Sequence, residues 1–171
     1  VDITDFSSIF ANASGTIKGN ASIIGKVDKP VVNAEFDIDK VVFNTFQLSS
    51  ANLSVGIDIN KDWQTSIKLR ATELFQESLL AQQIDFDIIG DAVAHKVFVD
   101  LHHPEYSLKH EFSGGVFKKN DDWRWAGKWE KGVIASAFDS LTLEKPTAIG
   151  VNLSSASIKP HCWLSSKLAV S

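Results

Sequence analysis

The sequence predicts an all-β chain that forms one elongated or curled antiparallel sheet, with at most short helical turns. The first observation is an alternation of apolar and polar residues through most of the chain, which places successive side chains on opposite faces of a strand. The second is a series of turn signals between the alternating runs. The third is their short spacing, which favours hairpins over parallel pairs because a parallel crossover needs about a dozen residues or more.

The alternation is first clear in residues 31–40, where aliphatic and aromatic residues share one face and Asn33 and three acidic residues share the other. Each run predicts a strand with one dry and one wet face. In chain order the dry-face residues are Val32, Ala34, Phe36 and Ile38; Leu53, Val55, Ile57 and Ile59; Ile67, Leu69 and Ala71; Ile84, Phe86 and Ile88; Val97, Val99 and Leu101; Tyr106, Leu108, His110 and Phe112; Trp123, Trp125, Gly127 and Trp129; Leu141 and Leu143; and Ile149, Val151 and Leu153. The turn signals are residues 27–30, 60–62, 90–91, 103–104, 119–122 and 145–146.

Two short segments interrupt this pattern. Phe6, Ile9 and Phe10 have the i, i+3, i+4 spacing of a helical turn, and Asp5 precedes them as a candidate N-cap. Residues 73–83 fit one or two helical turns or a loop, and we expect a loop.

What covers the dry face is left open by the pattern. A second sheet would cover it in a sandwich, and the sheet itself would cover it in a closed barrel. In an open curled sheet the face stays partly uncovered, and a large exposed apolar surface indicates a ligand or partner.

Composition narrows the classes of protein. The chain has 171 residues, 44% of them apolar and 22% charged, so it can form a core and is not expected to be disordered. The net charge of −4 argues against a dedicated nucleic-acid binder, and one cysteine excludes an internal disulfide framework. No apolar run approaches the length of about 18 residues that a membrane-spanning helix needs. Because there is no Met, even at position 1, we expect residues 1–171 to be a single segment cut from a longer protein.

A search for catalytic patterns predicts no enzyme. His110-Glu111 lacks the second histidine of a zincin helix, and residues 19–26 have the wrong spacing for a phosphate loop. His161 and Cys162 are neighbours that would point to opposite faces of a strand, so they are badly placed to share a proton. The five histidines form no His-x-His pair, so no metal site and no cofactor are predicted.

The tryptophans of residues 123–129 form the most distinctive group. Trp123, Trp125 and Trp129 share one face, whereas Arg124 and Lys128 lie on the other. A platform for single-stranded nucleic acid needs aromatic and cationic groups on the same face, so this strand does not fit one. Core packing, a wall for an apolar ligand and a sugar-stacking platform all remain open.

Two stretches resemble the TamB family, the translocation and assembly module proteins of diderm bacteria. Residues 14–32, with Ser14, Gly15, Gly19, Gly25 and Pro30, resemble its unit Ser-Gly-x-x-x-Gly-x-x-x-x-x-Gly-(x)4-Pro. The second stretch has the family's order of a Trp-x-Gly strand, a Leu-x-x-Pro segment and a Cys-Trp pair. Its parts are Trp123-Arg124-Trp125-Ala126-Gly127-Lys128-Trp129, residues 138–146 and Ile158-Lys159-Pro160-His161-Cys162-Trp163.

This resemblance implies a fragment from the C-terminal region of a periplasmic protein whose anchor in the inner membrane lies outside the chain. It implies a rolled sheet, U-shaped in section (a β-taco), with a concave hydrophobic groove that carries phospholipids toward the outer membrane. An outer-membrane barrel partner of the TamA type and a link to outer-membrane protein assembly are also implied. The family often has a second cysteine about ten residues after the first, but residues 164–171 have none, so Cys162 is a disulfide candidate whose partner lies outside the chain.

The residues and the resemblance together predict a non-catalytic lipid conduit. Phospholipid acyl chains would lie along its apolar face. The alternative is a β-sandwich binding module for carbohydrate or a partner strand. The expected groove residues are Val32, Phe36, Ile38, Leu53, Val55, Ile57, Ile67, Leu69, Ile84, Phe86, Ile88, Val97, Val99, Leu108, Phe112, Trp123, Trp125 and Trp129.

Overall fold

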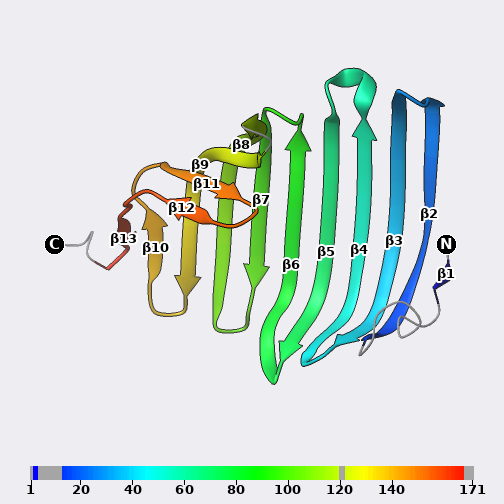
Figure 1. The fold of residues 1–171 in the computed structure, drawn as a ribbon. Helices are drawn as coiled ribbons and strands as arrows, with labels where there is room; N and C mark the ends of the chain where they lie inside the picture. The colour runs from blue at the N-terminus through cyan, green and yellow to red at the C-terminus, as the bar shows by residue number, and fades with distance from the viewer. Residues whose placement is uncertain (1, 4–12, 120–121, 168–171) are drawn as a thin grey trace.

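A computed structural model describes residues 2–3, 13–119 and 122–167 of the chain. These residues form one antiparallel sheet in which almost every strand pairs with its neighbours in sequence (Figure 1). The path runs from β1 to β10 in chain order and ends at β13, while β11 leaves the path from β9 and pairs with β12.

The strands are long in the first part of the chain and short near its C-terminus. Their bounds are β1 Asp2–Ile3, β2 Ala13–Lys26, β3 Lys29–Phe43, β4 Phe46–Asp58, β5 Gln64–Gln76, β6 Ser78–Gly90, β7 His95–His102, β8 Tyr106–Lys119, β9 Asp122–Ser136, β10 Ser140–Leu143, β11 Thr147–Asn152, β12 Ala156–Ile158 and β13 Trp163–Ser165. A three-residue 3₁₀ helix, η2 (Ile59–Lys61), lies between β4 and β5.

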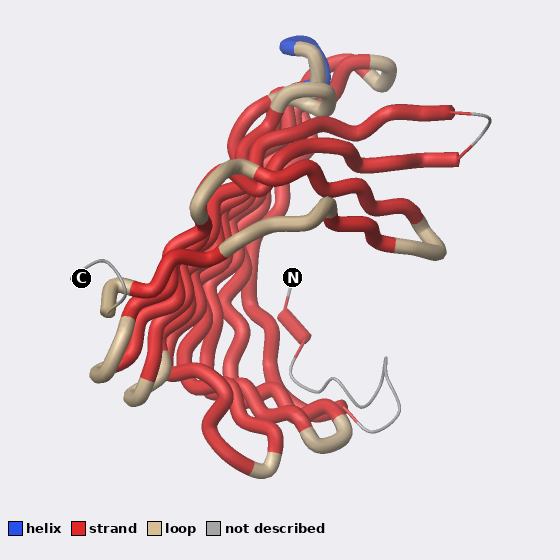
Figure 2. The backbone as a smooth tube through the Cα atoms, turned by 90° about the vertical axis from the view of Figure 1, so that its left-hand side faces the viewer, coloured by secondary structure: helices blue, strands red, loops and turns tan. Residues whose placement is uncertain are grey.

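The sheet is open and curled along the direction of its strands. Figure 1 shows the β11–β12 hairpin in front of the sheet, and Figure 2, turned by 90°, shows both ends of the long strands bending toward that same side. Among the described residues no second sheet packs on the first, and the strand path does not close on itself. The prediction of an open curled sheet is therefore confirmed, and the sandwich and the closed barrel are excluded for this part of the chain.

The strand register places the dry faces of neighbouring strands side by side. Across β3 to β7 one row of paired residues consists of Phe36, Leu53, Leu69, Phe86 and Val99. The row beside it consists of Ala34, Val55, Ile67, Ile88 and Val97. Cross-strand pairs of this kind stabilise a sheet by about 0.2–1 kcal/mol each, so the register and the apolar face support each other.

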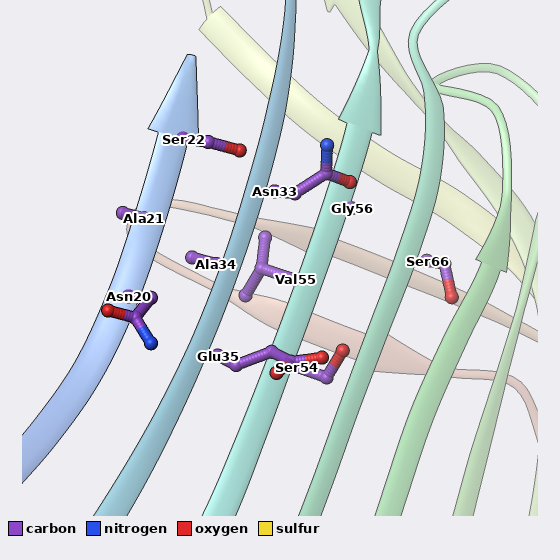
Figure 3. Close-up of a pocket in the computed structure, with 10 residues that line it drawn as sticks. All are labelled: Asn20, Ala21, Ser22, Asn33, Ala34, Glu35, Ser54, Val55, Gly56 and Ser66. Atoms are coloured by element: carbon purple, nitrogen blue, oxygen red, sulfur yellow. The ribbon is translucent and has the colours of Figure 1, made fainter.

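The polar side chains occupy the convex face. Figure 3 shows Ser22, Asn33, Glu35, Ser54 and Ser66 around a shallow hollow, with the β11–β12 hairpin passing behind the sheet. Because that hairpin lies on the side toward which the sheet curls, the alternate, apolar residues line the concave side.

This single layer has no conventional interior. None of the large side chains of the described residues is fully buried. The buried apolar residues are Ala13, Ala34, Ala51, Ala71, Ala81 and Leu143. Five of these six are alanines, whose small side chains are covered by larger neighbours without a second layer.

Most elements match the predictions, with two corrections. The predicted strands and the turn signals at 27–30, 60–62, 90–91, 103–104 and 145–146 are confirmed. The loop expected over residues 73–83 is wrong. Strand β5 continues to Gln76 and β6 begins at Ser78, so only Glu77, at φ 63°, lies between them. A bulge between Leu74 and Phe75 interrupts the alternation there, which concealed the strand. The helical turn suggested for Phe6 to Phe10 lies outside the described residues.

A pair of glycines lets β8 and β9 approach closely beneath an indole ring. Gly114 and Gly127 are paired in register, and a Cβ added to Gly127 would lie 2.1 Å from the Ser113 carbonyl oxygen and 2.7 Å from the Trp125 ring. The ring of Trp125 continues across the sheet and donates a hydrogen bond from Nε1 to His95 Nε2 of β7, at 2.7 Å. The indole therefore occupies the space that the missing side chains leave.

We predict that Gly127→Ala lowers the free energy of unfolding by about 2 kcal/mol or more, because the backbone or Trp125 must shift to admit the methyl group. Urea denaturation measures the change. Gly56→Ala is the matched control, since its added Cβ meets nothing closer than 3.7 Å, and it should be neutral or stabilising by about 0.5–1 kcal/mol. Equal stabilities for the two variants would contradict this account.

Candidate functional site: the apolar concave face

The predicted groove residues lie together on the concave side of the sheet. All of them are half-buried except Trp123, whose exposed fraction is 57%. Trp123 pairs in register with Lys118 near the tip of the β8–β9 hairpin, so it lies at the rim. Half-burial without a covering layer means that these side chains contact one another along the sheet and remain open on their outer side.

The chemistry of the concave face changes along the sheet. From β3 to β7 the paired rows contain aliphatic residues and phenylalanine. At β8 and β9 the same rows continue into His110, Phe112 and Trp129, which are all aromatic, and the rings of His110 and Trp129 carry nitrogen atoms. The face thus has an aliphatic part and an aromatic part.

Five rings form one cluster at the aromatic end, and Trp129 is at its centre. Its ring centroid lies 5.7 Å from Phe112, 5.1 Å from His110, 5.3 Å from Trp163 and 5.6 Å from His161. Trp163 and Phe112 approach Trp129 differently, at interplanar angles of 73° and 25°. Edge-to-face and offset contacts of this kind add about 0.5–1.5 kcal/mol per aromatic pair beyond area burial.

His110, His161 and Trp163 were not among the predicted groove residues. His110 follows the dry-face alternation of β8, which was the available signal. Trp163 reaches the cluster from β13, which pairs only with β10 in the described sheet. No local pattern near residue 163 indicates that contact, because β13 has only three residues.

A bulge makes this arrangement possible. Glu111 pairs with Lys131 and Phe112 pairs with Trp129, so β9 contains one extra residue. Odd-numbered residues of β9 face the concave side before the bulge, and even-numbered residues do so after it. Beyond the bulge the concave positions are Gly132 and Ile134, which pair with His110 and Leu108. Bulges re-aim side chains in this way.

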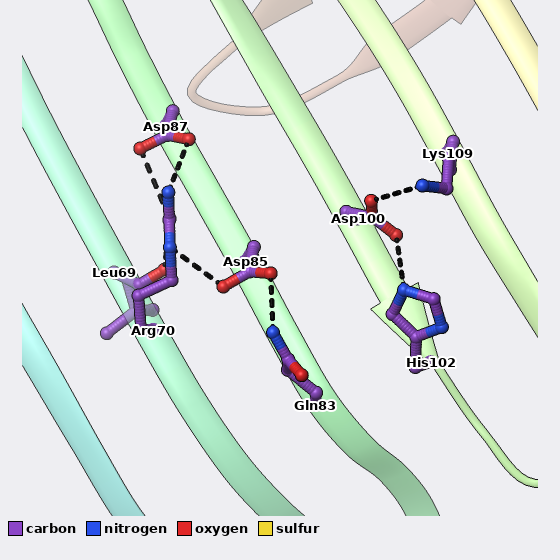
Figure 4. A network of polar contacts seen from close by, with 8 residues as sticks. All are labelled: Leu69, Arg70, Gln83, Asp85, Asp87, Asp100, His102 and Lys109. Atoms are coloured by element: carbon purple, nitrogen blue, oxygen red, sulfur yellow. Dashed lines mark hydrogen bonds and ion pairs between the residues drawn. The ribbon is translucent and has the colours of Figure 1, made fainter.

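The convex face carries ion pairs that cross the strands (Figure 4). Arg70 on β5 contacts Asp85 at 2.8 Å and Asp87 at 2.9 Å on β6, and the hydrogen bond with Asp87 raises the pKa of Arg70. Asp100 of β7 lies 2.9 Å from Lys109 of β8. Such exposed pairs contribute little stability each, but they keep this face hydrated.

A second convex pairing lies beneath the aromatic cluster. Glu111 lies 3.0 Å from Lys96 and 3.1 Å from Lys131, and hydrogen bonds from these two lysines lower the pKa of Glu111. The two faces of β8 therefore differ sharply in polarity.

The structure places His161 and Cys162 just before β13, outside any strand. The premise that they are neighbours within a strand and point to its opposite faces is therefore wrong. Cys162, the single cysteine of the sequence, is exposed and has a free thiol. Its carbonyl accepts a hydrogen bond from Glu144 N at 3.0 Å. Within residues 2–3, 13–119 and 122–167, no group of three His, Cys, Asp or Glu side chains is arranged to hold a metal ion. In the same part of the chain, no helix has the length and hydropathy required to cross a membrane.

The chain matches a model of one protein family, described as TamB, N-terminal domain, over residues 1–170. The sequence resemblance is thereby confirmed at the level of the family. Its finer implication, a fragment of the C-terminal region, is not supported, because the matching model describes the N-terminal domain. No curated protein and no solved structure matches the chain.

We predict that His110 makes the fold less stable as the pH falls below 6.5, the pKa of an ordinary histidine. Burial in the aromatic cluster lowers the pKa of His110 from 6.5. The unfolded chain then binds the proton more tightly, so stability is full above pH 6.5 and falls as the pH drops toward the lowered folded-state pKa. The variant His110→Phe should lose this part of the slope in urea titrations at several pH values. A slope equal to that of the unaltered chain would contradict the prediction.

Proposed function

Because the chain belongs to the TamB family, we propose that it forms a segment of a periplasmic conduit that carries phospholipids between the inner and outer membranes. The proposal rests on one observation, the mainly apolar concave face that extends from β3 to β9. In this proposal residues 1–171 are one β-repeat segment of a longer protein.

The physical task of such a conduit is to keep acyl chains out of water. An acyl chain of about 15 methylenes costs roughly 12 kcal/mol to expose, at about 0.8 kcal/mol per methylene. A half-buried row of aliphatic side chains offers the replacement contacts, while the open side of the curl leaves the head group in water. No bond is made or broken in this process, so the proposed role is not enzymatic and needs no cofactor.

The shape of the sheet suits continuous movement better than tight binding. The rows run across successive strands, so the apolar lane follows the trough and does not end in a closed pocket. An acyl chain can then exchange one set of aliphatic contacts for the next at nearly equal free energy. The charged convex face keeps the outside of the trough soluble.

The setting of the segment is also part of the proposal. The family suggests a parent protein in the periplasm of a diderm bacterium, with an anchor in the inner membrane outside this chain. The proposed partner is an outer-membrane barrel of the TamA type, and the proposed wider role is in outer-membrane protein assembly and envelope integrity. A disulfide between Cys162 and a cysteine outside the chain fits an oxidising compartment, and the exposure of Cys162 leaves it accessible.

We predict that the double variant Ile57→Lys and Phe86→Lys loses at least tenfold in bound phospholipid, because two ammonium groups would project into the acyl-chain lane. Native mass spectrometry and lipid extraction of the purified chain measure bound phospholipid, and circular dichroism checks that the β spectrum is retained.

The matched control places the same charges on the convex face of the same strands, as Ser54→Lys and Gln83→Lys. Both positions are exposed, so lipid binding should be unchanged. Retention of lipid by a folded concave-face variant would refute the proposed role of the trough.

A further inference from the structure

Two polar atoms in the aromatic cluster lack partners on an otherwise apolar face. Nε1 of Trp129 and Nδ1 of His110 are buried and have no hydrogen-bond partner among the described residues. Trp125, on the same strand, does satisfy its Nε1, through His95. Burying an indole N–H without an acceptor destabilises a fold, so the unpaired Nε1 of Trp129 requires an explanation.

Beside these atoms, aromatic rings fill the position that a side chain at residue 132 would take. Gly132 pairs in register with His110, and both residues are on the concave side. A Cβ added to Gly132 would lie 3.1 Å from Trp129 Cε2, the atom bonded to Nε1, and 2.9 Å from Trp163 Cη2. The nitrogen-bearing edge of Trp129 therefore lies over Gly132, under Trp163.

The cover over this position comes from Trp163, and the backbone on both sides of that residue is held. Residues 159–162 belong to no strand, but Lys159 N donates to the Ala148 carbonyl at 3.0 Å, Thr147 Oγ1 donates to the Lys159 carbonyl at 3.2 Å, and Glu144 N donates to the Cys162 carbonyl at 3.0 Å. On the other side of Trp163, Ser165 and Ser166 donate hydrogen bonds to Asp139 at 2.6 and 2.7 Å. Exposure of Trp129 Nε1 therefore requires the Trp163 side chain itself to turn away, while its backbone stays in place.

We propose that Trp129 and His110 form a polar station in the trough, where Trp129 Nε1 donates a hydrogen bond to an ester or phosphate oxygen of an amphipathic lipid. The oxygen reaches Trp129 when the Trp163 side chain turns away from Gly132. An indole N–H can only donate, which selects an acceptor oxygen, and the neutral imidazole of His110 offers a second polar contact through Nδ1. The acyl chain lies toward β3–β7, where the concave rows are aliphatic. This inference rests on the proposed lipid-binding function and adds where the polar part of the lipid binds.

The test uses three probes with the same 16-carbon chain: hexadecane, 1-monopalmitoylglycerol and hexadecyl phosphate. In the chain with ¹⁵N-labelled indoles, the Trp129 N–H resonance, assigned from its contacts to Gly132, should shift with one or both oxygen-bearing probes. Hexadecane should leave it unchanged. The glycerol ester and the phosphate distinguish the two sources of oxygen.

A conservative variant provides the second measurement. Trp129→Phe keeps an aromatic ring and removes the donor, so affinity for the responding oxygen-bearing probe should fall about five- to tenfold while affinity for hexadecane stays the same. Trp63→Phe, at an exposed indole in the turn before β5, is the matched control and should change neither affinity.

Three results would overturn the inference. One is an equal Trp129 response to all three probes. Another is a Trp129 resonance that is already typical of a hydrogen-bonded N–H and stays unchanged with every probe, as a resident water would produce. The third is an equal loss of affinity for all probes in Trp129→Phe. Binding of hexadecane without discrimination by oxygen would reject only the polar station, whereas binding of no probe would also reject the proposed conduit.

Discussion

The structure depends on one constraint, which is that a single curled sheet must stabilise itself without a second layer. In a sandwich, each apolar face is covered by another sheet. Here the covering is lateral: Leu53, Leu69 and Phe86 contact neighbours on adjacent strands and stay half-buried. Curvature brings these side chains closer together on the concave side, and the small residues Ala51 and Ala71 become buried where the rows are most crowded. The same curvature that stabilises the sheet leaves its apolar face open to an acyl chain.

The two faces also divide two physical requirements between them. The concave side has to remain apolar over many strands, and it has few features that fix one strand pairing against another. The convex side supplies such features, since Arg70 bridges Asp85 and Asp87 and Glu111 is held between Lys96 and Lys131. A slip by one residue would bring charges onto the concave face, so the alternation fixes the register strongly. The parity changes at bulges, and the bulge in β9 lets Gly132 come to lie beneath the aromatic rings.

The predictability of the structure follows from how far each feature reaches along the chain. The strands over 31–40, 53–59 and 84–88 were predicted because alternation is a local property of a half-buried strand. The segment 73–83 was misread because a bulge and two residues with positive φ, Glu73 and Glu77, break the alternation while the pairing continues. The groove residues were predicted from the same local alternation as the strands. The register places them on one face of the sheet, and their role as a groove stays a prediction. The contact of Trp163 with Trp129 had no local signal, since the two residues lie on different strands that do not pair with each other.

The sequence by itself determined that the chain is all-β, that each strand has one apolar and one polar face, and that its ends carry the features of the TamB family. These are properties of neighbouring residues, and the twofold period of a strand expresses them directly. Only the tertiary structure decided that the sheet stays open, which side becomes concave, and that β13 brings Trp163 over Gly132. These outcomes depend on curvature and on contacts between distant segments, and the sum of many weak packing terms sets them in a way that no short stretch of sequence encodes.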